Sequence, residues 1–554
     1  MRHGGKILVD HLAAQGVRRV FEVPGESFLA ALDGLYDCTA IRTIICRHEG
    51  GAAMMAEATG KLTGRPGICF ATRGPGAVNA LSGVYVAHMD ATPMILFVGL
   101  PATTLEDQTP FQDLEMEALF RPVSKWEAVI HDTSRIPEYV ARAFHVALSD
   151  RPGPVVLGLP ENVLSGMSAA GDVKPVESPS AAPSPKQMSA LMERLARARQ
   201  PMLLVGGPGW SADVQAAIEG FAARYDLPVA AAFRCQDYID NRHPCYVGHS
   251  GFGTDLKLQA ALRGADLIIA VGAELGEITT GGYTLIEAPN PAQFMAHVHP
   301  SAEWAGGVIR ADLPIVASAC GFGEALAALP FLNQPKARAW SRFRKDLRAA
   351  YEASLKPAPV PGNVEMGEVV RIVSETLPEN GLTTNGAGNY SMFVHRYFAF
   401  KRYRSGLAPI CGSMGYGLPA AIAAKLEDPS RPVVAFAGDG CFQMTGAEIG
   451  TAVQYGLPLV IIVANNGIYG TIRMHQERKY PGRVAGTSLV NPDFAALARS
   501  YGAEGCVVTR TADFEAVFRQ GLAADVPFVI ELKLDPEAIT PLITLSEVRD
   551  AAKG

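Results

Sequence analysis

Short apolar runs recur along the chain, and amphipathic stretches separate them. The clearest runs are residues 68–71, 94–98, 155–159, 202–205, 267–271, 294–298, 433–437, 459–464 and 528–532. Continuous apolar strands that alternate with helical stretches are typical of parallel sheets with both faces covered. The pattern therefore predicts an α/β fold of parallel sheets flanked by helices.

Two polar, proline-rich stretches divide the apolar runs into three blocks. The first stretch covers residues 168–186, and the second covers 356–362. Sequences of this kind are stiff and poorly suited to a core. We expect three domains, at residues 1–168, 187–348 and 363–554, and the two outer blocks are compatible with one shared α/β plan.

Composition narrows the class of protein further. The 554 residues include 48% hydrophobic and 19% charged residues, and the net charge of −6 offers no basic surface for nucleic acid. No apolar run reaches the length of a membrane span. Nine cysteines without a CxxC pair are typical of reduced core thiols, so we expect a cytoplasmic protein.

The most informative spacing lies in the third block. Gly438-Asp439-Gly440 follows one apolar run, and Asn465-Asn466 follows the next. We interpret the segment as strand, helix over about 443–455, and strand, which brings Asp439 and Asn466 to one sheet edge. Carboxylate and amide oxygens there suit Mg²⁺, and the following helix N-terminus suits a phosphate. The alternative is a turn followed by a capping asparagine.

Five further motifs occur in order along the chain. They are Phe-Glu-Val-Pro-Gly-Glu at 21–26, Arg-His-Glu-Gly-Gly-Ala-Ala at 47–53, Thr-Arg-Gly-Pro-Gly-Ala-Val-Asn at 72–79, Asn-Gly-Ala-Gly-Asn-Tyr at 385–390, and Cys-Gly-Ser-Met-Gly-Tyr-Gly at 411–417. With these motifs the chain resembles the thiamine-diphosphate (ThDP) enzymes, specifically the acetohydroxyacid (acetolactate) synthase-like branch, over essentially its whole length. The resemblance implies an N-terminal pyrimidine-binding, a central and a C-terminal diphosphate-binding domain.

The resemblance assigns the catalytic role to Glu49. In this family the glutamate pairs with N1′ of the aminopyrimidine and favours the imino form of the 4′-amino group, which then removes the C2 proton. The alternative for an isolated glutamate at this position is a first-turn acid that interacts with the helix macrodipole.

The resemblance also assigns the cofactor and metal contacts. Gly412 is expected to present its carbonyl to the 4′-amino group, and Met414 to hold ThDP bent. Mg²⁺ is expected on Asp439, the Asn466 side chain and a backbone carbonyl near Ile468. The full set of expected cofactor contacts is Pro24, Gly25, Asn79, Gly388, Asn389, Tyr390, Gly412, Met414, Gly438, Gly440, Cys441, Ile468, Tyr469 and Gly470.

Substrate residues are expected where the chain departs from the synthases. Arg73 stands where many relatives carry a small hydroxyl residue, so it could hold a carboxylate or be an exposed loop residue. Gln112, in contrast, lies in a Phe111-Gln112 stretch that resembles the synthase segment lining the pocket, and it could be a polar contact to the substrate or a surface-loop glutamine. Ile472 is a further candidate contact. His475 occupies a specificity position or a solvated helix face. Residues 272–278 lack the arginine-rich loop of the synthases, which argues against FAD and leaves the question open.

The expected activity is decarboxylation of a 2-oxo acid followed by transfer of the resulting carbanion to an acceptor carbonyl. The alternatives are a ThDP-dependent C–C lyase, a simple 2-oxo-acid or acyl-CoA decarboxylase, and a ThDP-binding partner protein without turnover. Glu49 and Asp439 lie in different outer domains. In this family they come from different subunits, so a homodimer or homotetramer with active sites at the dimer interface is expected.

Overall fold

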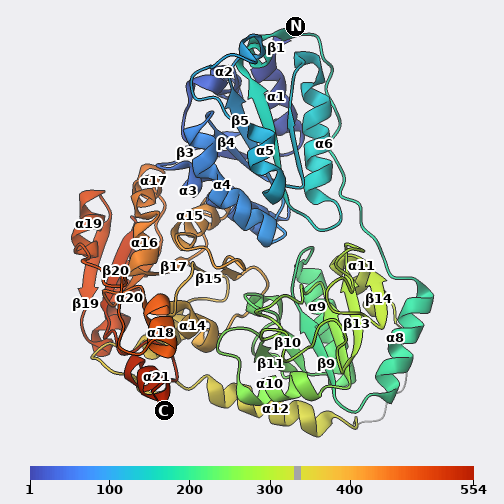
Figure 1. Ribbon diagram of the computed structural model, residues 1–554, viewed down its shortest axis with the longest axis vertical. Coiled ribbons are helices and arrows are strands. Elements are labelled where there is room, and N and C mark those ends of the chain that lie inside the picture. The colour runs from blue at the N-terminus through green and yellow to red at the C-terminus, as the bar shows by residue number, and fades with distance from the viewer. Residues whose placement is uncertain (330–337, 554) are drawn as a thin grey trace.

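The computed structural model describes residues 1–329 and 338–553. It contains three six-stranded parallel sheets, one in each block of the sequence (Figure 1). All nine apolar runs that predicted strands form strands, which confirms the α/β fold class. The expected central range 187–348 and C-terminal range 363–554 include residues 330–337 and 554, which lie outside the described residues.

The N-terminal sheet has the strand order β3-β2-β4-β5-β7-β6. Its strands are β2 (Arg19–Glu22), β3 (Arg42–Ile45), β4 (Gly67–Ala71), β5 (Met94–Leu100), β6 (Trp126–Val129) and β7 (Pro154–Pro160). Its helices are α1 (Gly4–Ala14), α2 (Leu29–Tyr36), α3 (Glu49–Thr63), α4 (Pro75–Met89), α5 (Met116–Phe120), α6 (Ile136–Leu148) and α7 (Glu161–Ser165), with short 3₁₀ turns η1 (Glu26–Phe28), η2 (Thr103–Leu105), η3 (Arg121–Val123) and η4 (Thr133–Arg135). An antiparallel pair, β1 (Arg2–His3) and β8 (Met167–Ser168), joins the two ends of this segment.

The central sheet has the order β11-β10-β9-β12-β13-β14. Its strands are β9 (Pro201–Val205), β10 (Val229–Ala231), β11 (Tyr246–His249), β12 (Leu267–Val271), β13 (Phe294–His299) and β14 (Leu313–Val316). Its helices are α8 (Pro185–Arg197), α9 (Ala212–Tyr225), α10 (Leu256–Gly264), α11 (Ala319–Ala327) and α12 (Ser341–Ser354), with the 3₁₀ turn η5 (Gln236–Tyr238). Helix α8 begins inside the predicted linker, because Ser184 and Gln187 form a capping box and Pro185 occupies the first turn.

The C-terminal sheet has the order β16-β15-β17-β18-β20-β19. Its strands are β15 (Leu382–Asn385), β16 (Gly406–Leu407), β17 (Val433–Gly438), β18 (Val460–Asn465), β19 (Glu504–Val508) and β20 (Phe528–Lys533). Its helices are α13 (Met366–Thr376), α14 (Tyr390–Tyr397), α15 (Gly417–Glu427), α16 (Asp439–Gln443), α17 (Ile449–Gln454), α18 (Gly470–Lys479), α19 (Phe494–Ser500), α20 (Thr511–Ala523) and α21 (Leu545–Ala551), with the 3₁₀ turn η6 (Gly446–Glu448).

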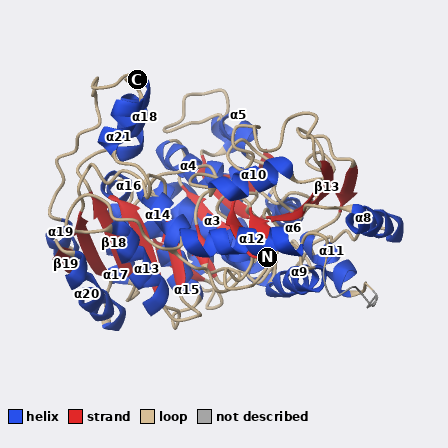
Figure 2. Ribbon diagram, turned by 90° about the horizontal axis from the view of Figure 1, so that it is seen from below, coloured by secondary structure: helices blue, strands red, loops and turns tan. Residues whose placement is uncertain are grey.

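The two outer sheets share one topology. From one edge of each outer sheet to the other, the strands are the second, first, third, fourth, sixth and fifth of that domain in chain order. In the central sheet they are the third, second, first, fourth, fifth and sixth. The outer domains therefore follow one plan, and the central domain follows another. Figure 2 shows the strands enclosed between helices, as expected for sheets that are buried on both faces.

The outer domains also share a hydrophobic core. Alternate residues of β17 and β18 face opposite sides of the sheet: Val434 and Ile462 pack with α13, α14 and α20, whereas Ala435 and Ile461 face α15. Helix α15 packs against α3 of the N-terminal domain. Helices from both outer domains thus form one continuous apolar layer.

One predicted element differs from the structure. The single helix expected over 443–455 is wrong, because the segment forms α16, the turn η6 and α17. The break lets Thr445 donate its hydroxyl to the Gly415 carbonyl at 2.7 Å. It also lets the Glu448 carboxylate reach the N-terminal domain, where it accepts a hydrogen bond from the Arg47 N–H at 3.1 Å.

Candidate active site

The C-terminal half of the site lies at the carboxyl ends of β17 and β18. These strands are parallel neighbours in which Gly438 pairs with Ala464. Asp439 therefore follows one strand at the level where Asn465 ends the other, and Asn466 comes next. The structure thus has the strand pairing that the spacing in the sequence predicted.

Asp439 is the buried carboxylate of this edge, with 3% of its surface exposed. Its Oδ1 accepts a hydrogen bond from the Gly440 N–H at 2.8 Å, and its Oδ2 accepts one from the Gly467 N–H at 2.8 Å. Burial raises the pKa of the Asp439 carboxyl, and these hydrogen bonds oppose the rise. The carboxylate is held in one orientation by backbone from both strand ends.

Sequence reasoning missed Asn491, which orients the same carboxylate. Its Nδ2 donates to Asp439 Oδ2 at 2.7 Å and to Asn465 Oδ1 at 2.9 Å. Its Oδ1 accepts from Gln443 Nε2 at 2.9 Å. The sequence around Asn491 reads as a turn before a helix, so no local signal marks this contact.

A cavity of about 250 Å³ opens beside Asp439. It brings together nearly all of the C-terminal residues that the sequence assigned to the cofactor, the metal and the substrate. The predicted residues in its lining are Gly388, Asn389, Tyr390, Gly412, Met414, Gly438, Asp439, Gly440, Cys441, Asn466, Ile468, Tyr469, Gly470 and Ile472.

Two helix N-termini line this cavity, those of α14 and α18. The residues that precede them, Asn389 and Tyr469, make no side-chain capping bond to their own helices. Instead, Asn389 Oδ1 accepts a hydrogen bond from Thr471 Oγ1 at 2.9 Å, which joins the two N-termini. First-turn N–H groups without intrahelical partners, together with the helix macrodipoles, suit a diphosphate.

Two glycines shape the cavity. Gly412 has φ +73, and a Cβ placed on it would meet no heavy atom within 4 Å, so the absent side chain leaves open space. A Cβ on Gly440, in contrast, would lie 2.5 Å from the ring of Tyr469. An extended, partly apolar cofactor with an anionic end fits a cavity that has glycine backbone at one side and helix N-termini at another.

The donor set also suits Mg²⁺. The Asp439 carboxylate, the Asn466 amide oxygen and the Ile468 carbonyl are all oxygen ligands, as Mg²⁺ prefers. Asn466 Oδ1 accepts a hydrogen bond from the Ile468 N–H at 3.3 Å, which turns the amide oxygen toward this loop. Within residues 1–329 and 338–553, His, Cys, Asp and Glu form no metal-holding group of three or more.

The N-terminal half of the site lies at the carboxyl ends of β2, β3 and β4. Glu49 begins α3, and 8% of its surface is exposed. Its Oε2 accepts a hydrogen bond from Asn79 Nδ2 at 2.9 Å, so Asn79 contacts the glutamate directly. Glu49 Oε1 lies close to the backbone of Gly76, because a Cβ on this glycine would lie 3.2 Å from the oxygen.

The loop that follows β2 packs against the loop that follows β4. A Cβ on Gly25 would lie 2.4 Å from the Cβ of Thr72, so this close approach requires glycine. Ser27 Oγ and Thr72 Oγ1 are hydrogen bonded at 2.8 Å. Pro24 precedes this contact and is exposed.

Arg73 is buried and paired with two carboxylates. Its Nη2 donates to Glu26 Oε1 at 2.5 Å, and its Nη1 donates to Glu161 Oε1. The next residue, Gly74, is packed against the Gln112 carbonyl, which would lie 2.8 Å from a Cβ on the glycine. Gln112 thus packs beside the residue that follows Arg73. Because Arg73 is only 8% exposed, its interpretation as an exposed loop residue is wrong.

The remaining substrate candidates lie on α18. Ile472 lines the cavity and has 55% of its surface exposed. His475 is exposed on the same helix and is not among the lining residues. The structure therefore places Ile472, but not His475, at the cavity wall.

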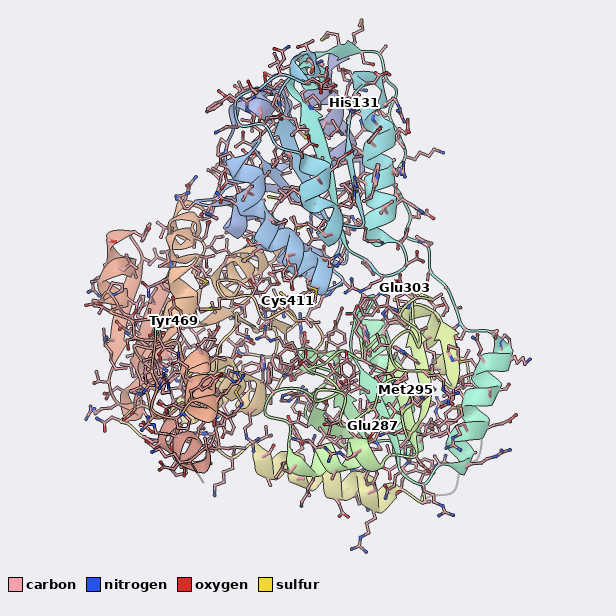
Figure 3. All side chains as sticks on the ribbon, viewed as in Figure 1. His131, Glu287, Met295, Glu303, Cys411 and Tyr469 are labelled. Carbon is pink, nitrogen blue, oxygen red and sulfur yellow. The ribbon has the colours of Figure 1, made fainter. Side chains whose placement is uncertain are left out.

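The described lining of the 250 Å³ cavity contains only residues between Met366 and Ile539. None of the described N-terminal site residues, Glu49 included, contributes to it. Figure 3 shows Tyr469 in the C-terminal domain and Cys411 toward the region where the three domains meet. The chain thus carries two separate groups of candidate site residues, one in each outer domain.

Comparison with known families agrees with this architecture. Residues 2–119 match the N-terminal TPP binding domain of thiamine pyrophosphate enzymes, residues 188–329 match their central domain, and residues 386–532 match their C-terminal TPP binding domain. The chain belongs to the thiamine pyrophosphate enzyme family, and it is a ThDP-dependent enzyme.

Curated relatives narrow the resemblance. An acetolactate synthase large subunit of Corynebacterium glutamicum is 30% identical over 98% of this chain and 88% of its own length. The acetolactate synthase isozyme 2 large subunit of Escherichia coli is 30% identical over 98% of this chain and 97% of its own. The similarity to the acetolactate synthases confirms the branch that the sequence motifs indicated.

Proposed function

We propose that this protein decarboxylates a 2-oxo acid and joins the remaining acyl carbanion to an acceptor carbonyl, as an acetolactate synthase-like carboligase. When bound, ThDP supplies the electron sink that accepts the carbanion electrons. The observation that carries the proposal is the cavity beside Asp439, which combines a buried carboxylate with two helix N-termini.

The proposed roles of the residues follow from their chemistry. Asp439, the Asn466 amide and the Ile468 carbonyl hold Mg²⁺, and the N-termini of α14 and α18 bind the diphosphate. Glu49 shares a proton with a ring nitrogen of the cofactor, and Asn79 orients the glutamate by its hydrogen bond to Oε2.

The complete site requires two copies of the chain in this proposal. A cavity lined by C-terminal residues needs a partner that supplies Glu49, and a second copy carries one. Exposed apolar side chains near both groups of site residues support self-association: Phe111 is 71% exposed, Ile472 55% and Met444 54%. A homodimer, or a homotetramer of two dimers, follows.

Arg73 is the proposed contact for a substrate carboxylate. Because Glu26 and Glu161 already pair with its two Nη atoms, a substrate carboxylate has to replace one of these partners. Gln112, Ile472 and His475 remain proposed specificity residues.

We propose that the protein does not use FAD, since residues 272–278 lack an arginine-rich loop. The cytoplasm is the proposed location. Within the described chain, no helix is long and apolar enough to span a bilayer.

A substrate panel tests the proposed reaction. Purified protein with ThDP and Mg²⁺ is incubated with single and paired 2-oxo acids and with acyl-CoA compounds, and the products are identified by mass spectrometry. Carboligation predicts a new C–C-bonded acid together with CO₂. An aldehyde as the sole product indicates a decarboxylase, and cleavage without CO₂ indicates a lyase. ThDP binding without any turnover contradicts the proposed carboligation and favours a ThDP-binding partner role. The absorption spectrum of the same protein reports FAD.

A further inference from the structure

Arg234 of the central domain has an unusual backbone and side-chain environment. It follows β10 and has φ +61, a left-handed conformation that non-glycine residues rarely adopt. Its guanidinium lies 5.0 Å from the ring centroid of Phe233. Backbone strain of this kind persists only where the surrounding structure holds the residue in place, and strained residues are often found at functional positions.

The guanidinium of Arg234 joins two loops of another domain. Its Nη2 donates to the Gly386 carbonyl at 3.0 Å, and its Nη1 donates to the Pro409 carbonyl. Among the described residues it makes no hydrogen bond to a carboxylate, and its buried Nε has no partner. A half-buried cation whose hydrogen-bond partners are carbonyls and not carboxylates is costly to desolvate, so stability is a weak reason for its presence.

Both loops lead directly into the cofactor cavity. The segment that begins at Gly386 continues to Gly388 and Asn389, and the segment after Pro409 continues to Gly412 and Met414. The two segments lie side by side, because a Cβ on Gly386 would lie 3.4 Å from the Ser413 carbonyl oxygen.

The N-terminal domain holds the second loop from its other side. Asp90 Oδ2 accepts a hydrogen bond from the Ile410 N–H at 2.9 Å, and Lys61 donates to the Ala408 carbonyl at 3.2 Å. Lys61 also pairs with Asp90. Both other domains therefore fix the segment before Gly412. Arg234 in addition contacts the loop that begins at Gly386.

We propose that Arg234 is a positioning residue that sets the spacing between the 386–389 loop and the 409–414 loop, and thereby the distance between the diphosphate and thiamine ends of the cofactor cavity. This inference rests on the proposed ThDP-dependent function. Arg234 is absent from the described lining of the cavity, so it acts through the loops. A planar guanidinium carries donors on separate nitrogens and can bind two carbonyls at once, which a lysine ammonium does less well.

The first comparison is between Arg234→Met, Arg234→Lys and the control Arg348→Met. Arg348 is also a central-domain arginine that donates to backbone carbonyls, those of Asn241 at 2.8 Å and Tyr246 at 3.0 Å, but its partners lie within its own domain. Calorimetric titration with ThDP at saturating Mg²⁺ measures the Kd. We expect Arg234→Met to raise the Kd and lower kcat about tenfold or more, since small misplacements of reacting groups are costly.

Arg234→Lys should give an intermediate Kd, and Arg348→Met should lower Tm while its ThDP Kd stays within about twofold of the wild type. The near-ultraviolet circular dichroism of bound ThDP should change in the Arg234 variants alone. A cavity of about 340 Å³ borders Arg234, so methylguanidinium at millimolar concentration can enter. It should restore ThDP affinity to Arg234→Ala and leave Arg348→Ala unchanged.

The outcomes separate this inference from the proposed function. If Arg234→Lys and Arg234→Ala bind ThDP with wild-type affinity and an unchanged circular dichroism spectrum, the positioning role is wrong while the proposed function stands. Equal losses of ThDP affinity in the Arg234 and Arg348 variants, without rescue, indicate a purely structural role and also overturn it. Absence of ThDP binding in the wild type contradicts the proposed function itself.

Discussion

Glu448 of the C-terminal domain accepts a hydrogen bond from the His48 N–H of the N-terminal domain at 3.1 Å. The same carboxylate accepts the Arg47 N–H at 3.1 Å and the Thr451 hydroxyl at 2.5 Å. Arg47 and His48 are the two residues before Glu49, so a buried acid of one outer domain holds the start of the helix that carries the candidate catalytic glutamate of the other. A Cβ on Gly51 would lie 2.4 Å from Glu448 Oε1, so any other residue at position 51 would displace this carboxylate.

We therefore expect Glu448→Gln to impair turnover by loosening the start of α3. An amide oxygen is a weaker acceptor than a carboxylate, and its NH₂ group faces backbone donors, which costs about 1–3 kcal/mol. We expect kcat to fall about tenfold with a smaller change in the ThDP Kd. Steady-state kinetics and calorimetric titration measure the two quantities.

Glu219→Gln is the matched control. Glu219 also accepts a backbone N–H, that of Asp240 at 2.8 Å, and burial raises the pKa of Glu219 as it raises that of Glu448. Glu219, however, lies in the central domain. If both variants lower Tm alike and neither lowers kcat, the contact of Glu448 with the α3 start serves stability only.

Much of this architecture could be predicted from the sequence, because the buried strands are continuous apolar runs and the motifs lie at strand ends. Asp439 and Asn466 follow such runs, so their meeting at one sheet edge required only parallel pairing. Asn491 and Glu448 could not be predicted this way. Each acts through hydrogen bonds to residues far away in the sequence, and neither leaves a periodic or spacing signal in its own segment.

The second prediction concerns Glu49. Glu49→Gln keeps the side-chain shape and leaves an oxygen that can accept from Asn79 Nδ2, but an amide cannot exchange a proton with a ring nitrogen. We expect turnover to fall at least about 100-fold, whereas ThDP and Mg²⁺ still bind with nearly wild-type Kd. Single-turnover assays and calorimetric titration measure the two effects.

Asn79→Ala provides the comparison for Glu49→Gln. It keeps the carboxyl group and removes only its orienting donor, so turnover should fall less than in Glu49→Gln. Wild-type turnover in Glu49→Gln would falsify the proposed catalytic role.

The third prediction concerns the metal. Asn491 donates to Asp439 Oδ2 at 2.7 Å, and groups that orient a ligand typically change metal affinity about 10–100-fold when removed. We expect Asn491→Leu to weaken Mg²⁺ affinity by this amount, seen as a higher Mg²⁺ concentration needed for half-maximal ThDP binding.

Excess Mg²⁺ should restore ThDP binding to Asn491→Leu, because the ligands themselves remain. Asp439→Ala removes a ligand and should not be restored in this way. Removal of Mg²⁺ from the wild type with a chelator should release ThDP. An unchanged Mg²⁺ requirement in Asn491→Leu means that Asn491 does not orient the metal ligand.

The last prediction concerns pH and Glu22, a strand residue of β2 with 1% of its surface exposed and an Oε2 without a partner in the described chain. Burial raises the pKa of Glu22 from 4.5 to about 7. The folded protein therefore holds this proton more tightly than the unfolded chain. The contribution of this protonated carboxyl to the free energy of unfolding is fully present below about pH 4.5 and is lost as the pH rises through about 7. The free energy of unfolding falls by about 3 kcal/mol over this range. Glu22→Gln carries no charge, so its Tm should match the wild type near pH 5 and exceed it at pH 8, as measured by thermal unfolding at both values.

Glu138→Gln is the control for Glu22→Gln. Glu138 is exposed, and its hydrogen bond from Arg135 lowers its pKa, so Glu138→Gln should give no gain in Tm at pH 8. Equal Tm values for Glu22→Gln and wild type at pH 8 would mean that the Glu22 carboxyl is ionised in the folded protein at little cost.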